Sequence, residues 1–150
     1  MALEGIGLGG STITGVIGPP AAPGSGRGVL VQLGKVTSVN LNSAAASTIF
    51  TTPAVGGFTR CRVTEVAVGN ISGIATTASF SFGQSATPTD WAATATYAGL
   101  SAAGKFIYIN PPTASGSTEI TATGINFVIN VTIPQGVATT ADVTAWGYYE

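Results

Sequence analysis

From Val29 onward the chain is a succession of short β-prone runs separated by turn-forming residues, and this rhythm limits the folds open to it. All but one of the stretches between them, such as Gly34-Lys35 or 134–136, contain Gly or Pro, which favour turns. The candidate strands are 29–33, 36–41, 47–52, 60–68, 76–82, 105–109, 118–121, 125–132 and 142–149. Short strands at this spacing predict an all-β fold, an antiparallel β-sandwich of jelly-roll type.

Alternation of period two supports the strands and indicates which side chains face the core. In 125–132 the odd-numbered residues are large and apolar, whereas Asn126 and Asn130 fall on the other face. Phe80 and Phe82 alternate with serines in the same way. Small polar residues on the outer faces are typical of half-buried antiparallel sheets.

Residues 84–104 fit this scheme least well. One helical turn capped by Asp90 is possible there, because Asp is a favoured N-cap residue. We expect instead a long loop between strands, anchored by Trp91.

Residues 1–28 differ from the rest of the chain. Gly and Pro in 5–10 and 18–26 oppose any regular helix or central strand. Yet the segment is too apolar for a plain linker, so we expect an extended arm that docks on a neighbouring surface, ahead of one sandwich domain over 29–150. The alternative is a free tail, since chain ends often fray. The expected arm anchors are Leu3, Ile6, Leu8, Ile13, Val16 and Ile17.

Charged residues make up only 7% of the chain, against roughly 25% in average globular proteins. So little charge leaves an exposed surface poorly solvated, which predicts that copies of the chain or other subunits cover it. The net charge of −1, without clustered basic residues, argues against nucleic-acid binding. No uninterrupted apolar run is long enough for a membrane helix, and the first residues do not resemble a secretory signal. We therefore expect synthesis in the cytoplasm.

The residue inventory argues against an enzyme and against a bound cofactor. The chain has no histidine and one cysteine, which excludes a Ser–His–Asp triad and makes a zinc site within one chain implausible. The six acidic residues share no short motif. The Gly5-x-Gly7-x-x-Gly10 pattern matches a dinucleotide fingerprint but has no strand before it. We assign no catalytic, cofactor or metal residues.

The strand around residue 61 concentrates several unusual side chains. Cys61 should point inward with Val63, as a buried thiol. Arg60 and Arg62 should lie on the opposite face, where they form either a salt bridge between subunits or charge protection of an edge strand. Strict alternation places Glu65 on the face opposite Arg62.

The aromatic residues allow two interpretations. They can be core and interface anchors, which we favour, or a platform that stacks on sugar rings, as in a fibre or adhesin-type glycan-binding module. The residues concerned are Trp91, Tyr97, Tyr108, Trp146, Tyr148 and Tyr149.

Three segments carry a resemblance to a known group of proteins: FTTPAVGGFTRCRVTEVAVGN at 50–70, Phe82-Gly83 to Trp91, and Trp146-Gly147-Tyr148. Together they resemble small structural proteins of tailed bacteriophages, loosely over residues 47–149. The resemblance implies a jelly-roll capsid decoration (cement) protein, or a related head or tail accessory protein. It further implies a virion location and a homo-oligomer, with a trimer favoured, bound to the major capsid protein or another virion protein. It implies no catalytic residues.

Overall fold

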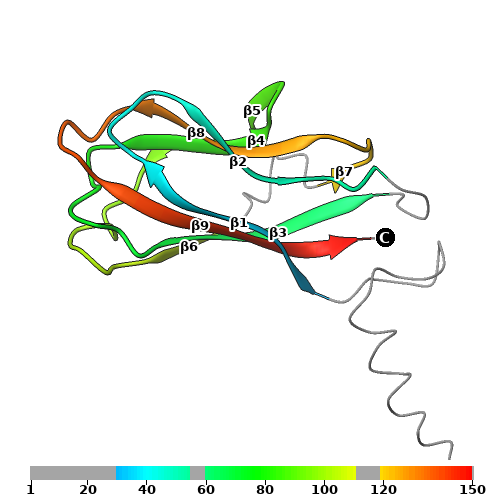
Figure 1. Cartoon of the computed structure of the whole chain (residues 1–150), viewed down its shortest axis with the longest axis horizontal. Helices are drawn as coiled ribbons and strands as arrows, with labels where there is room; N and C mark the ends of the chain where they lie inside the picture. The colour runs from blue at the N-terminus through cyan, green and yellow to red at the C-terminus, as the bar shows by residue number, and fades with distance from the viewer. Residues whose placement is uncertain (1–29, 55–59, 111–118, 150) are drawn as a thin grey trace, which may run out of the picture.

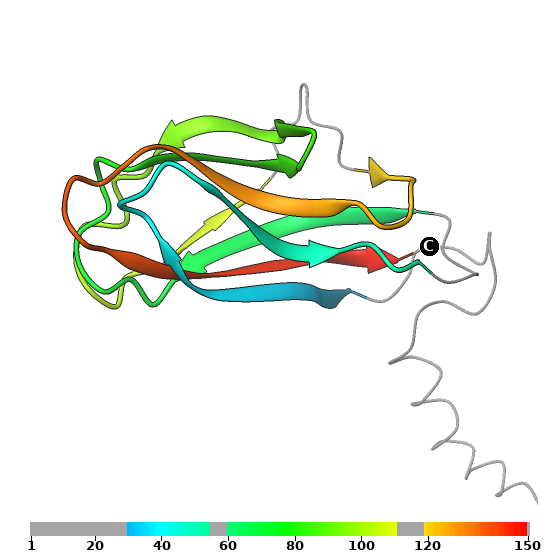
Figure 2. The same cartoon turned by 45° about the horizontal axis from the view of Figure 1, so that its top comes forward.

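Two antiparallel sheets pack face to face in the computed structural model, which describes residues 30–54, 60–110 and 119–149. Figures 1 and 2 show the two layers from two directions. Sheet A contains β1 (Val31–Asn40), β3 (Cys61–Gly69), β6 (Ile107–Ile109), β7 (Glu119–Ile120) and β9 (Thr140–Tyr149). Sheet B contains β2 (Ala46–Thr51), β4 (Ser79–Gln84), β5 (Thr87–Thr96) and β8 (Asn126–Ile133). The described residues include no helix, so the all-β prediction is confirmed.

The strand order is that of a jelly roll. Sheet A runs β1-β9-β3-β6 and sheet B runs β2-β8-β4-β5, so consecutive strands pass from one sheet to the other except at β4–β5 and β6–β7. Four connections, 41–45, 70–78, 97–106 and 134–139, meet at one end of the sandwich. Leu30 and Tyr149 lie at the other end, because Val31 pairs with Gly147 while Asn40 pairs with Thr140.

Strands β6 and β7 occupy successive places along one side of β3. Ile107–Ile109 pair with Val68–Val66, and Glu119–Ile120 pair with Arg62–Cys61. The edge of sheet A is therefore built from two short pieces, separated in the sequence by residues 110–118.

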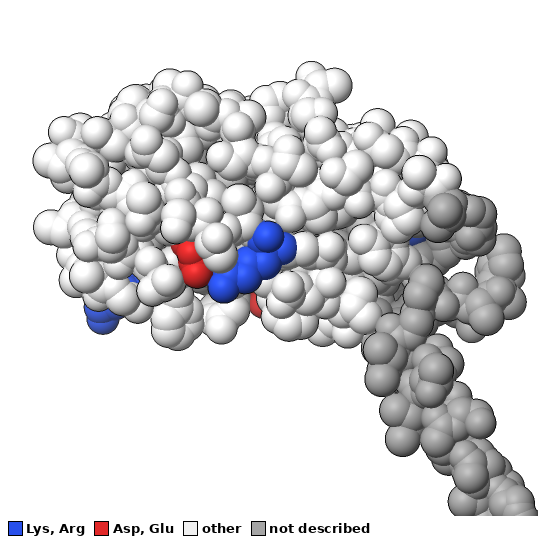
Figure 3. All heavy atoms as spheres, viewed as in Figure 1, with Lys and Arg blue, Asp and Glu red and all other residues white. Residues whose placement is uncertain are grey.

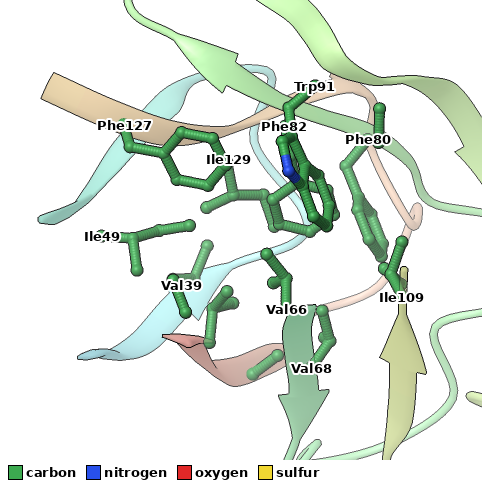
Figure 4. Close-up of a cluster of buried hydrophobic side chains, with 14 of the residues drawn as sticks. Val39, Ile49, Val66, Val68, Phe80, Phe82, Trp91, Ile109, Phe127 and Ile129 are labelled. Carbon is green, nitrogen blue, oxygen red and sulfur yellow. The ribbon is translucent and has the colours of Figure 1, made fainter. Parts of the chain in front are cut away.

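The core lies between the sheets and follows the predicted alternation. Phe127, Ile129 and Val131 of β8 are buried, and Figure 4 shows β8 side chains facing those of sheet A. Phe80 and Phe82 of β4 are also buried, but Ser79 and Ser81 are buried as well, so β4 is covered on both faces and not half-buried as its alternation predicted. Removing each such side chain from water contributes about 1.5–3 kcal/mol, so this layer provides the main favourable term in folding.

Strand β1 corrects one predicted boundary. Gly34-Lys35 does not separate two strands but lies inside one ten-residue strand with two register shifts against β9. A Cβ at Gly34 would come within 2.5 Å of Ile49 O and Phe50 Cβ. The lack of a side chain at Gly34 therefore allows β1 and β2 to approach closely where the sheets meet. Gly34 does not form a turn.

Strand β5 corrects the prediction for residues 84–104. Thr87–Thr96 form a strand at the edge of sheet B, where Pro88 is tolerated. Asp90 does not cap a helical turn. Its carboxylate accepts hydrogen bonds from Gln84 N at 3.0 Å and Gln84 Nε2 at 2.7 Å, which closes the β4–β5 hairpin.

The predicted arm, residues 1–28, and its six apolar anchors lie outside the described residues. Its boundary with the sandwich domain over 29–150 therefore stays a prediction. Within the described ranges, no helix is long and apolar enough to cross a membrane.

Candidate functional site

The described surface carries few charges, and they are unevenly distributed. Figure 3 shows one face on which small groups of basic and acidic atoms interrupt an otherwise uncharged surface. Sheet A carries five of the eight described charged residues, whereas sheet B carries only Asp90. The eight are Lys35, Arg60, Arg62, Glu65, Asp90, Lys105, Glu119 and Asp142.

The two arginines predicted as interface charges meet one carboxylate of their own chain. Arg62 Nη2 donates to Glu119 Oε1, and Arg60 Nη1 lies 3.7 Å from Glu119 Oε2. The hydrogen bond from Arg62, reinforced by the charges of both arginines and opposed by partial desolvation, lowers the pKa of Glu119. These contacts tie β7 to β3. A role for Arg60 and Arg62 between subunits stays a prediction.

A β-bulge in β3 overturns the predicted position of Glu65. The register against β9 shifts between Val63 and Glu65, so the buried residues change from odd to even numbers. Glu65 therefore lies opposite Trp146 and shares the outer face with Arg62. Cys61 and Val63 point inward, as predicted.

A polar cluster surrounds Asp142 on the outer face of sheet A. Its carboxylate accepts hydrogen bonds from Ser38 N at 3.1 Å and Asn70 Nδ2 at 3.2 Å, and Lys35 Nζ lies 3.2 Å away. The hydrogen bond from Ser38 contributes most to the lowered pKa of Asp142. Ser38 and Asn70 both have positive φ, 55° and 49°. The carboxylate thus holds two residues in the left-handed backbone conformation, one at a register shift within β1 and one directly after β3, which L-residues rarely adopt.

Cys61 is a structural thiol, as predicted. It is fully buried, and desolvation raises its pKa to about 12. The thiol therefore stays protonated and unreactive near neutral pH. Its register partner Tyr149 also has a pKa raised to about 12, mainly by desolvation and secondarily by the charge of Cys61.

The aromatic residues do not gather into one platform. Trp91 is 1% exposed, packs edge-on against Phe82 and Phe127, and donates its indole N–H to Val63 O at 3.0 Å. It is a core residue that no sugar ring can reach. Tyr97 stacks on Phe80 with ring centroids 4.8 Å apart. Trp146, Tyr148 and Tyr149 are partly buried along β9, whereas Tyr108 is exposed on the separate strand β6.

One surface was not anticipated from the sequence. We call it the loop end: the connections 41–45, 70–78, 97–106 and 134–139 with the adjoining strand residues. It holds five of the six large apolar side chains that are strongly exposed in the described part of the chain. They are Ile74, Phe106, Tyr108, Ile133 and Val137. Ile74 and Val137 fall between the candidate strands, which is the signal that the sequence offered, whereas Phe106 falls inside the candidate strand 105–109.

No group of three or more potential metal ligands occurs among the described residues.

Comparison with known proteins gives one structural likeness. No family model and no curated protein matches the sequence. The structure is similar to a chain of the "Cyanophage Pam1 capsid asymmetric unit", with a TM-score of 0.50 and 21% sequence identity. The match covers 89% of this chain and 94% of that chain. At this identity the likeness shows a shared fold and leaves function to be argued from the surface.

Proposed function

We propose that this chain is a structural protein of a phage virion, a capsid decoration (cement) protein that stabilises the head through contacts between subunits. It acts without catalysis, as a homo-oligomer for which we favour a trimer. Its partners are copies of itself and the major capsid protein or another virion protein.

The near-neutral surface of the sandwich carries the proposal. Five of the eight described charged side chains form ion pairs within the chain: Lys35 with Asp142, and Arg60 and Arg62 with Glu119. A domain that works alone in solution relies on exposed charge to stay apart from its neighbours. A surface with so few unpaired charges is instead suited to being covered by other subunits.

The structural likeness supports the same proposal. Jelly rolls occur both in viral capsids and in lectins, so the fold alone does not decide between them. The similar chain comes from a capsid, and the match spans nearly the whole of both chains. Burial of Trp91 removes one of the two tryptophans that a glycan platform would need.

In the proposed assembly the arm, residues 1–28, lies across neighbouring subunits and holds them together. Many weak contacts repeated by symmetry add avidity well above that of one contact. Arg60 and Arg62 contribute charged contacts between subunits. The apolar anchors are Leu3, Ile6, Leu8, Ile13, Val16 and Ile17.

The test measures binding of the purified chain to empty capsids prepared without it. The full chain should bind, and deletion of residues 2–26 should strongly reduce occupancy. A finer pair of variants keeps the length constant: Ile13→Ser with Ile17→Ser, against Thr12→Ser with Thr14→Ser as control. Loss of two buried apolar side chains should weaken binding about tenfold or more, whereas the control should not.

Two results would contradict the proposal. A full chain that does not bind capsids removes the decoration function, and undiminished occupancy after the deletion removes the role of the arm. Sedimentation equilibrium of the free full chain tests the favoured trimer. A monomer at all concentrations would contradict it.

A further inference from the structure

The loop end combines exposed apolar side chains with an almost complete lack of charge. Ile74, Phe106, Tyr108, Ile133 and Val137 are each more than half exposed. Phe106 and Tyr108 are in ring contact, and Thr139 Oγ1 donates to Ile74 O at 3.2 Å, which brings Ile74 beside the connection that carries Val137. Exposed apolar residues scattered singly are ordinary, but residues gathered at one end of a domain mark an interaction surface. Leu30, the sixth exposed large apolar residue of the described part, lies at the opposite end of the sandwich.

Hydrogen bonds between the connections hold this surface in one shape. The 134–139 connection is joined to 41–45 by Leu41 N to Thr139 O at 2.8 Å and by Gln135 N to Leu41 O at 2.9 Å. The side-chain oxygen of Gln135 accepts from both Thr77 N and Ala78 N at 2.9 Å. These bonds tie the connections from both sheets together.

The remaining connection is fixed in the same way. Ala75 N donates to Leu100 O at 2.8 Å, and Gly104 N donates to Ile71 O at 2.9 Å. Phe106 rests against Gly69, where an added Cβ would come within 2.8 Å of Phe106 Cβ. Its ring meets Tyr108 edge-on at 5.5 Å. The exposed apolar groups are thus largely ordered before any partner arrives, which lowers the entropic cost of binding.

Lys105 is the single charged residue in the four connections. It is exposed, and no acidic side chain in the described part of the chain forms an ion pair with it. An interface that covers the loop end would bury this ammonium group, which is costly unless the partner provides an opposite charge.

We propose that the loop end docks on an apolar surface of a different protein, one that places a carboxylate opposite Lys105. This inference rests on the proposed virion function and adds which end of the sandwich faces the partner. A second copy docked end to end about a two-fold axis would bring two Lys105 side chains together, and like charges across an interface oppose binding. A partner with an acidic residue amid apolar contacts would both cover the apolar side chains and pair with Lys105.

The chain offers an internal control for this proposal, because Lys35 and Lys105 are its two lysines. Lys35 lies on the outer face of sheet A, in the cross-strand row that runs through Thr144 and Ala67 to Tyr108, and its ammonium group forms an ion pair with Asp142. Amine-reactive labelling of the full chain, free and bound to capsids, therefore compares Lys105 in a connection with a lysine on the sheet beside the loop end. On the capsid, labelling of Lys105 should slow about tenfold or more through exclusion of solvent, and by a larger factor than labelling of Lys35.

Substitutions test the chemistry of the contact. Val137→Asp should weaken capsid binding about 30-fold or more, because it buries an unpaired charge, while Thr94→Asp, exposed on β5, should leave it unchanged. Lys105→Glu should weaken binding about tenfold more than Lys105→Met if a carboxylate faces this position. Circular dichroism of each variant checks the fold.

The outcomes separate this proposal from the one on which it rests. If the full chain does not bind capsids, both are overturned. If it binds while Lys105 labels at its free rate and Val137→Asp binds as well as Thr94→Asp, only the docking of the loop end is overturned. If Lys105 of the free chain becomes protected as concentration rises, the occupant is a second copy and the proposal of a different protein is wrong.

Discussion

Replacing Trp91 by alanine should destabilise the sandwich by about 3–5 kcal/mol, the range for deleting a large aromatic side chain from a core. The structure supports the upper part of this range. Trp91 is 1% exposed, has ring centroids 5.8 Å from Phe127 and 6.1 Å from Phe82, and donates to Val63 O. The milder Trp91→Phe retains part of the packing but loses this hydrogen bond, which should cost about 1–3 kcal/mol.

Urea denaturation followed by circular dichroism measures both effects. The matched control is Trp146→Ala, because Trp146 is the second tryptophan and lies on the outer face of sheet A. It should cost about 1 kcal/mol or less. A Trp91→Ala variant as stable as Trp146→Ala would refute the placement of Trp91 in the core and, with it, the inward register of β5.

Three further predictions follow from individual contacts. The pKa values of Glu119 and Asp142 are lower in the folded chain than in the unfolded chain. Their ionised carboxylates therefore stabilise the fold at pH values above the ordinary carboxyl pKa, and this stabilisation is lost as the pH falls through the folded-state pKa values. Acid titration of unfolding should therefore show a loss below about pH 4 that Glu119→Gln with Asp142→Asn reduces; an unchanged profile would contradict this. Cys61 should resist a thiol reagent at pH 8 until denaturant is added, and rapid reaction of the folded chain would contradict its burial. Gly147→Ala should prevent normal folding, since the new Cβ would strike Arg62 O, whereas Gly73→Ala meets nothing closer than 3.7 Å and should leave thermal stability nearly unchanged.

Much of the fold was predictable because alternation reports directly on burial. The inward faces of β8 and β9 and the buried Cys61 follow from period two alone. The predicted strand boundary at Gly34 was wrong because the sequence does not show whether a glycine permits a turn or a close approach between strands. Its reason, the contact with Phe50, exists only once the two sheets are packed.

The remaining differences between sequence and structure have separate physical causes. The bulge in β3 shifts Glu65 to the outer face, and an extra residue in one strand leaves no mark in its composition. Strand β5 was missed because Pro88 and small residues weaken its pattern, and an edge strand tolerates them. The loop end, likewise, joins connections that are distant in sequence, so only topology brings Ile74 and Val137 to one surface.

The broken edge formed by β6 and β7 has a bearing on how copies of this chain coexist at high local density. An intact edge strand offers a continuous row of backbone donors and acceptors on which another chain can extend the sheet. Here one margin of sheet A is split into pieces of three and two residues, and β1 at the other margin is interrupted by two register shifts. Crowded copies therefore have little template for fibril-like growth on sheet A, where side-chain surfaces are left to direct their association.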